Sequence, residues 1–164
     1  MTAYTTIDSP LGELLLVGDG GALRGLYLQQ RRLPVGPPPE WRREPDAFAA
    51  VSGQLGEYFA GERTSFDLSL ALTGTPFQLR VWEALGEVGY GETLSYGELA
   101  RRIGRPSAAR AVGAANGANP ISIVIPCHRL VGAGGAMTGY SGGVESKRLL
   151  LDLETSAASS ICSG

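Results

Sequence analysis

The sequence predicts an α/β protein of the α+β type, with an N-terminal antiparallel sheet plus helix and a C-terminal helical domain that contains a helix-turn-helix. Three observations predict this organisation. The first third of the chain consists of short β-type runs between turn signals. From Thr75 onward, the hydrophobic residues follow helical spacings instead. The segment Leu72-Thr73-Gly74-Thr75-Pro76 fits neither pattern, so we expect domains over residues 1–73 and 74–156.

The N-terminal elements follow from local patterns. Residues 4–7, 12–17 and 22–28 are short apolar runs separated by Gly-containing turns, which favours an antiparallel meander. Residues 46–61 carry apolar side chains at three-, four- and seven-residue spacings, so we expect a helix that packs on the sheet. Residues 66–70 alternate apolar and polar side chains and predict one more strand.

Capping signals open the first helices of the second half. Thr75 can cap a helix that has Pro76 at its first position. Ser95 and Glu98 have the spacing of a capping box, which predicts a helix over residues 96–103.

A third helix is expected over residues 108–116, with Ser107 as its cap, after the tight turn Gly104-Arg105-Pro106. Two short helices joined in this way have the layout of a helix-turn-helix, although such pairs are also ordinary packing units. The third helix is rich in Ala and Gly, and Arg110 is its only long polar side chain. Such a helix can approach a narrow groove and insert one arginine. The same composition also suits a tightly buried helix, and both interpretations can hold on opposite faces.

Composition excludes several classes of protein. With 164 residues and 43% hydrophobic content, the chain can bury a core, which excludes disorder, collagen and coiled coil. Residues 1–9 do not resemble a signal peptide, and no apolar run approaches about 18 residues, so we expect a cytoplasmic protein. The only cysteines are Cys127 and Cys162, and the only histidine is His128, so we expect no disulfide framework, no metal and no cofactor. The Ser- and Ala-rich residues 157–164 predict a disordered tail.

The chemistry-bearing residues follow the β-branched run 121–125. Pro126 ends this run, and Cys127-His128-Arg129 comes next. A thiol with an ordinary pKa of about 8.5 is mostly protonated at neutral pH, so it needs a base or a positive charge to become a strong nucleophile. His128 is the available base. Neighbouring side chains of a strand point to opposite faces, so this pairing requires a turn or helical start after Pro126. A buried cysteine beside a hydrogen-bonded histidine is the alternative for the dipeptide alone.

A wider set of motifs resembles one family. Asn119-Pro120, Pro126-Cys127-His128-Arg129 and Gly139-Tyr140-Ser141-Gly142-Gly143 closely resemble segments of the O6-alkylguanine-DNA alkyltransferases, which are suicide repair proteins. Further segments match in order and spacing: Phe77-Gln78, Val81-Trp82, Tyr90-Gly91-Glu92-Thr93, Ser95-Tyr96 and Ala109-Arg110-Ala111-Val112-Gly113. The resemblance covers residues 75–154, and it is looser in the N-terminal third, for which it implies a ribonuclease-H-like domain.

The resemblance implies a role for each matching residue. Cys127 would accept the alkyl group from guanine O6 in a single turnover, without regeneration. His128 would remove the thiol proton through a water molecule, and Glu154 would orient His128. Asn119 would tie the turn before the active site. Tyr96 would turn the 3' phosphate and donate a proton to N3 of the departing guanine.

The resemblance also implies how DNA is bound. The partner would be duplex DNA with O6-alkylguanine, and O4-alkylthymine is a second candidate substrate. The target nucleotide would be flipped out, with Arg110 taking its place in the duplex. A monomer is expected, and cooperative assembly on DNA stays open. The DNA-binding residues implied are Arg110, Tyr96, Thr93, Ser95, Arg105, Ala108, Ala109 and Gly113. The guanine-pocket residues implied are Tyr140, Ser141, Pro120 and Val131.

Two alternatives from other classes remain. An alkyltransferase-like binding protein recognises lesions without accepting the alkyl group, but such relatives lack the cysteine that is present here as Cys127. A Cys/His hydrolase would turn over and would need an oxyanion site, which the sequence does not reveal. Glu145 and Lys147, beyond the glycine loop, are expected at the surface.

The charge is distributed unevenly along the chain. The formal net charge of -2 argues, taken whole, against a polyanion-binding protein. However, residues 1–73 hold six basic and nine acidic side chains, while residues 74–164 hold eight and seven. Residues 99–144 contain no acid and five arginines, which predicts a basic face of about five charges with salt-sensitive affinity for DNA. These arginines are Arg101, Arg102, Arg105, Arg110 and Arg129.

Overall fold

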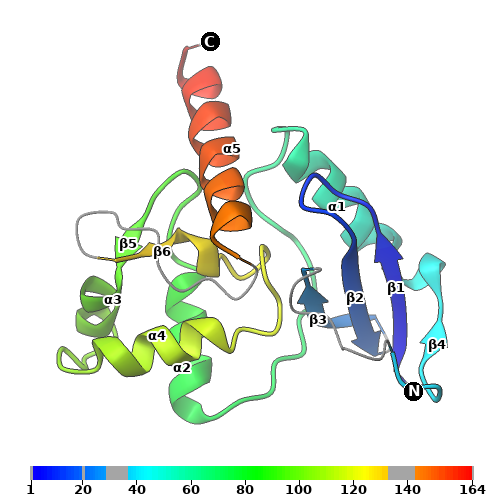
Figure 1. The fold of residues 1–164 in the computed structure, drawn as a ribbon, viewed down its shortest axis with the longest axis horizontal. Helices are drawn as coiled ribbons and strands as arrows, with labels where there is room; N and C mark the ends of the chain where they lie inside the picture. The colour runs from blue at the N-terminus through cyan, green and yellow to red at the C-terminus, as the bar shows by residue number, and fades with distance from the viewer. Residues whose placement is uncertain (1, 20, 29–36, 133–142, 164) are drawn as a thin grey trace. The chain divides into compact units, whose positions relative to one another are not determined.

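The computed structural model describes residues 2–19, 21–28, 37–132 and 143–163, with side chains described as far as residue 157. It divides into two compact units, which are drawn in Figure 1. One unit comprises Met1–Leu72 and Pro120–Val124, and the other comprises Thr73–Asn119 and Ile125–Gly164. The short stretch 120–124 therefore groups with the N-terminal sheet, although it lies inside the range 74–156.

The N-terminal sheet has four strands in the order β3-β2-β1-β4. β1 (Ala3–Ile7), β2 (Leu14–Asp19) and β3 (Ala22–Tyr27) pair antiparallel in sequence order, which confirms the predicted meander. β4 (Arg42–Arg43) lies parallel to β1. Its two exposed arginines give no hydrophobic pattern, so the sequence does not reveal this strand.

One helix packs in the N-terminal unit. A 3₁₀ turn, η2 (Pro45–Phe48), leads into α1 (Ala49–Phe59), where the sequence predicts one continuous helix. Phe48, Leu55 and Tyr58 are buried, in agreement with the predicted apolar face.

The strand predicted at residues 66–70 is not formed. Only one parallel bridge, Leu23 with Leu70, joins this stretch to the sheet. The backbone N–H of Leu23 donates to Ser69 O, and that of Ala71 donates to Leu23 O. The apolar residues of the stretch are only half-buried, so the alternating pattern lacks the packing that would extend the pairing.

The β-branched run 121–125 also does not form a regular strand. It makes one parallel bridge, between Ile121 and Leu26 of the same unit. The chain then turns at Ile123, which has a φ of 73°. The N–H of Val124 donates to Ser122 O at 2.8 Å, which closes a γ-turn of the rarer, strained hand. Burial of Ile121 and Ile123 holds this strained turn in place.

The C-terminal unit is mainly helical (Figure 1). Thr75 caps its first helix, as predicted, and Gln78 completes a capping box. The predicted box of Ser95 and Glu98 is confirmed as well. The elements of this unit are α2 (Pro76–Leu85), β5 (Leu94–Ser95), α3 (Tyr96–Arg102), α4 (Ala109–Gly117), the 3₁₀ turn η3 (Cys127–Arg129), β6 (Leu130–Val131) and α5 (Val144–Ser163).

The predicted cap at Ser107 is wrong. Ala108 is the N-cap residue of α4, and no side chain caps this helix. The Ala108 N–H already donates to Arg105 O in the preceding turn, and the first helical bond runs from Val112 N–H to Ala108 O. The turn after α3 therefore takes one residue more than the sequence suggests.

α4 has the two contrasting faces that the sequence left open. Val112, Ala115 and Asn116 are buried, while Arg110, Ala111 and Ala114 are exposed. The indole Nε1 of Trp82 in α2 donates to Ala115 O at 2.8 Å and so fixes the buried side. A packing helix and an exposed arginine thus coexist in one element.

α5 is helical to Ser163, whereas the sequence predicts a disordered tail over 157–164. The segment from residue 157 to residue 163 contains neither Gly nor Pro to end a helix. No helix within the described ranges is both long and apolar enough to span a lipid bilayer.

Candidate active site

Cys127 follows a tight turn at Pro126. Pro126 has φ -78° and ψ 65°, and the Cys127 N–H donates to Ile125 O at 2.7 Å, so the turn is an inverse γ-turn. The 3₁₀ turn η3 starts at once, with the Arg129 N–H donating to Pro126 O. The turn that the Cys-His pairing requires is therefore present. Cys127 is 1% exposed, and His128 is fully buried.

Two buried asparagines hold this turn against the end of α4. Asn119 Nδ2 donates to Ile125 O at 2.9 Å, which closes the loop of residues 119–125. Asn116 Nδ2 donates to Cys127 O at 3.3 Å. The structure thus places Asn119 where the family resemblance expects it. Asn116 was not singled out in the sequence, because an asparagine in an Ala/Gly helix has no distinguishing pattern.

Glu154 of α5 lies against His128. His128 Nε2 and Glu154 Oε2 are 2.7 Å apart, and both side chains are fully buried. The Gly91 N–H donates to Glu154 Oε1 at 3.3 Å. The structure therefore brings together Cys127 and His128 from one turn and Glu154 from α5, 26 residues after His128.

Arg129 binds both oxygens of Glu154. Its Nε donates to Oε1 at 2.8 Å and its Nη2 to Oε2 at 3.0 Å, so the guanidinium grips the carboxylate with both prongs. Arg129 is only 7% exposed. Its assignment to the basic face is therefore wrong, because its charge is directed inward at Glu154.

The electrostatics of this cluster favour a neutral His128. Burial opposes the charged form of Glu154, but the hydrogen bonds from His128 and Arg129 and the positive charge of Arg129 outweigh burial and lower its pKa to about 2. Burial lowers the pKa of His128, and the attraction of Glu154 only partly offsets this effect. An ionised carboxylate only accepts hydrogen bonds, so the proton of the neutral imidazole must be on Nε2. His128 Nδ1 is then a buried acceptor, and it has no hydrogen-bond partner among the described residues.

The interpretation of Lys147 as a surface residue is wrong. Its side chain is 0% exposed, and its Nζ donates to Leu130 O at 2.5 Å. Burial lowers the pKa of Lys147, while attraction to Cys127 acts in the opposite direction. Lys147 precedes Glu154 by seven residues, so both lie on one face of α5, and this spacing is the signal that could have placed it. Glu145 is exposed, as expected.

The residues expected to bind DNA lie in the segment that runs from Thr93, just before β5, through α3 to α4. Thr93, Arg105 and Arg110 are exposed, whereas Ser95, Tyr96, Ala108, Ala109 and Gly113 are half-buried. Tyr96 packs against Gly113, because a Cβ built there would lie 3.5 Å from Tyr96 Cε1. The Arg105 guanidinium lies 6.0 Å from the centroid of the Phe77 ring. Of the five arginines that the sequence assigns to the basic face, four are exposed, since Arg129 is buried.

The expected guanine pocket is described only in part. Tyr140 and Ser141 lie outside the described residues. Val131 is buried in β6, where it pairs with Ser95 of β5. Pro120 is half-buried and belongs to the N-terminal unit.

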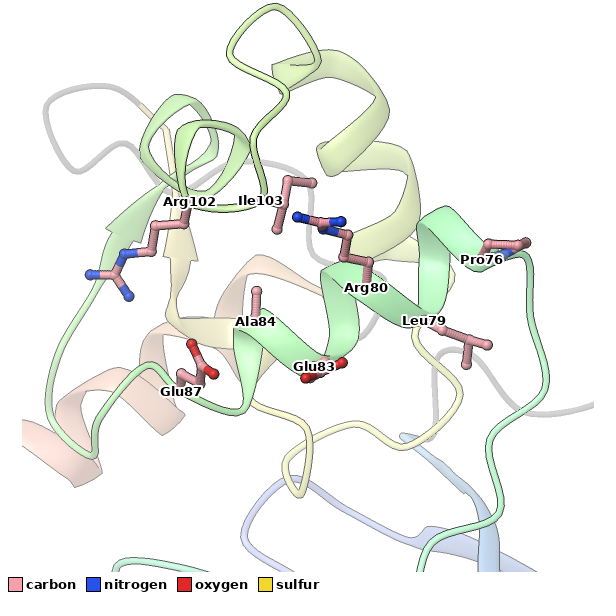
Figure 2. Close-up of a pocket in the computed structure, with 8 residues that line it drawn as sticks. All are labelled: Pro76, Leu79, Arg80, Glu83, Ala84, Glu87, Arg102 and Ile103. Carbon is pink, nitrogen blue, oxygen red and sulfur yellow. The ribbon is translucent and has the colours of Figure 1, made fainter.

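A groove of about 560 Å³ lies elsewhere in the C-terminal unit. Figure 2 shows it between α2, with Leu79 and Glu83, and the end of α3, with Arg102. Its lining residues are Pro76, Leu79, Arg80, Glu83, Ala84, Glu87, Arg102 and Ile103. No cysteine or histidine lines it, and its charges are of both signs, so it is not the site of the Cys127 chemistry.

No cluster of three or more His, Cys, Asp and Glu side chains that could hold a metal ion occurs within the described part of the chain. The cluster around Cys127 has instead the members of a nucleophilic site: a thiol, a neutral imidazole, a carboxylate and two cations.

Two protein-family models match the chain and together cover nearly all of it. The model of the 6-O-methylguanine DNA methyltransferase DNA binding domain matches residues 76–156. The model of the same family's ribonuclease-like domain matches residues 2–72. The chain belongs to the 6-O-methylguanine DNA methyltransferase family. The two matches confirm the fold class expected from the sequence, and the Cys127 cluster lies wholly within the first of them.

Individual members of this methyltransferase family match nearly end to end. The methylated-DNA--protein-cysteine methyltransferase of Mycobacterium tuberculosis is 55% identical over 159 residues, which are 96% of this chain and 95% of the relative. That of Methanosarcina acetivorans is 48% identical over 153 residues, 93% of this chain and 98% of the relative. The crystal structure of Mycobacterium tuberculosis OGT in complex with DNA has a TM-score of 0.89 and 53% identity, covering 94% of each chain.

Proposed function

We propose that this chain repairs DNA by taking the alkyl group of O6-alkylguanine onto Cys127. The observation that carries the proposal is the burial of Cys127 in one cluster with a neutral His128, an ionised Glu154 and the ammonium of Lys147. In the transfer, the Cys127 Sγ forms a bond to the alkyl carbon, and the bond from that carbon to guanine O6 breaks. The electron pair stays on the guanine, which leaves as the neutral base after it takes up a proton.

His128 supplies the base for this reaction. Its Nδ1 takes the thiol proton, directly or through one water molecule, while Glu154 Oε2 holds the Nε2 proton. Because Glu154 stays ionised, the imidazolium that forms is stabilised by an adjacent negative charge. Glu154 is therefore proposed as the residue that orients His128.

Lys147 stabilises the thiolate. The attraction between its ammonium and Cys127 acts on both partners, so it favours the ionised form of each. Arg129 is paired with Glu154, whereas the Lys147 ammonium acts on Cys127.

Exposed residues of the C-terminal unit suit the binding of duplex DNA. O6 is out of reach inside a stacked base pair, so the nucleotide must be flipped, at a cost of a few kcal/mol. Arg110 is exposed on α4 and can fill the space left by the flipped nucleotide. Tyr96 lies at the start of α3, beside this helix, where it can contact the backbone of the extruded nucleotide.

Mass spectrometry tests the proposed function. The chain is incubated with duplex DNA that contains O6-methylguanine and is then digested. We expect one methyl group on the peptide that contains Cys127, and none in a Cys127→Ser variant. Cys162→Ser is the matched control, and it should be methylated as fully as the unchanged chain. Tight binding to the lesion without any adduct would instead support a binding protein and contradict the proposal.

A further inference from the structure

All three guanidinium nitrogens of Arg129 donate hydrogen bonds within the protein. Nε and Nη2 grip the two oxygens of Glu154, and Nη1 donates to Val88 O at 2.6 Å. The guanidinium also lies 5.7 Å from the centroid of the Tyr90 ring. These contacts join the active-site turn to α5 and to the loop that follows α2.

The grip fixes the direction of the Glu154 carboxylate. A glutamate has three side-chain torsions, so its carboxylate can rotate unless its oxygens are engaged. Arg129 donates one hydrogen bond to each oxygen, and the Gly91 N–H donates a further one to Oε1. Oε2 is thereby left facing His128 Nε2 at 2.7 Å. The tautomer and orientation of His128 therefore depend on Arg129, through Glu154.

The charge of Arg129 has a second effect. The charged or titratable groups that face His128 are Glu154 and Lys147 from α5 and Arg129 and Cys127 from η3. Of these, Glu154 favours a protonated histidine, and Arg129 and Lys147 oppose it. Without Arg129, the full attraction of a buried carboxylate would act on His128 and favour the imidazolium. An imidazolium cannot accept a proton from Cys127.

We propose that Arg129 is a positioning residue for the transfer reaction, because its grip on Glu154 keeps His128 neutral and keeps Nδ1 available as the proton acceptor. This role rests on the proposed function. In it, Arg129 contacts neither the substrate nor the DNA and acts on the reaction only through Glu154 and His128. It also distinguishes Arg129 from the exposed arginines of α3 and α4.

The pH dependence of the transfer rate tests this role. Single-turnover rates are measured with O6-methylguanine DNA from about pH 5.5 to about pH 8.5, which brackets the ordinary titration of histidine. For Arg129→Gln we expect the acid limb of the profile to move to higher pH, so the loss of rate is larger at the acid end and reaches at least about tenfold there. Arg129→Lys keeps the charge but not the two-pronged grip, so it should be slower with a smaller shift. Arg148→Gln, an exposed position on α5, should match the unchanged chain.

A double variant separates an effect on folding from an effect on the reaction. Arg129→Gln removes the guanidinium that pairs with the buried negative charge of Glu154, which destabilises the fold. Arg129→Gln combined with Glu154→Gln removes that charge, and we expect it to fold and to lose the shift of the acid limb, although it remains slow. Thermal unfolding and affinity for undamaged duplex DNA confirm that each variant is intact. If Arg129→Gln folds and loses rate equally at all pH values, or if the double variant keeps the shift, Arg129 has only a structural role. No transfer by the unchanged chain would instead overturn the proposed function itself.

Discussion

At the scale of single residues, burial separates the active cluster from the other charged side chains. Cys127, His128 and Glu154 could be placed together from the family resemblance, and the structure brings them together. Lys147 and Arg129 could not, because long cationic side chains are rarely buried and the sequence does not show their partners. The seven-residue spacing from Lys147 to Glu154 was the available signal, and it becomes informative only when Glu154 is known to be buried.

Replacing Lys147 tests its proposed effect on the thiolate. Lys147→Met keeps most of the side-chain volume and removes the ammonium, so a smaller fraction of Cys127 is ionised at neutral pH. One unit in a thiol pKa changes the thiolate fraction about tenfold, and we expect a loss of transfer rate of about this size at pH 7. The rate should recover as the pH is raised. Arg148→Gln, the exposed neighbour, is the control, and an equal rate for Lys147→Met and the unchanged chain at pH 7 would refute the effect.

At the scale of elements, the sequence predicts the two capping boxes correctly, whereas its two strand-like runs do not form regular strands. The boxes at Thr75 and Ser95 rest on contacts within four residues, so the sequence contains them completely. The runs 66–70 and 121–125 look like strands, but each finds only one bridge. Whether such a run extends depends on a distant partner strand, and local propensity does not determine that.

A pair of serine variants tests the caps. Ser95→Ala removes the hydroxyl that accepts from Glu98 N–H, so it should lower the free energy of unfolding by about 1 kcal/mol. Ser107→Ala should change it by less than about 0.5 kcal/mol, because Ser107 caps no helix. Urea unfolding of both variants measures the difference. Equal losses at the two positions would mean that α4 begins at Ser107 after all.

At the scale of the whole molecule, a net charge of -2 conceals a local basic surface. Arg101, Arg102, Arg105 and Arg110 are exposed on α3, on α4 and in the turn between them. The sequence could count the arginines of this region but could not show that Arg129 faces inward. With four exposed charges we expect modest, salt-sensitive affinity for undamaged DNA.

The salt dependence of DNA binding tests this surface. Each arginine that neutralises a phosphate contributes about 0.9 to the slope of log affinity against log salt. Arg105→Gln should therefore reduce the slope by about this amount, while Arg43→Gln, exposed on β4, should leave it unchanged. Fluorescence anisotropy with an undamaged duplex measures both slopes. A slope unchanged by Arg105→Gln would remove that residue from the proposed interface.

Acid stability tests the charges assigned to the cluster. Burial lowers the pKa of His128 in the folded chain below its ordinary value of 6.5. As the pH drops below 6.5, His128 is therefore protonated in the unfolded state but not in the folded state, so the free energy of unfolding should fall. Glu154 adds a second loss of stability as the pH falls from 4.5 to about 2, because over this range its carboxyl group is protonated in the unfolded state but still ionised in the folded state. Urea unfolding over this range should show a smaller second loss in Glu154→Gln. Equal second losses in the two chains would mean that Glu154 is not ionised as described.

The stoichiometry of methyl transfer tests the central claim most directly. A fixed amount of the chain is titrated with increasing duplex DNA that carries a radiolabelled O6-methyl group, and the label bound to protein and the label released to solution are both counted. Water does not readily hydrolyse a thioether, so we expect bound label to reach a plateau at one methyl per chain, with none released. Continued release of label beyond one methyl per chain would show turnover by hydrolysis, and that result would contradict the account.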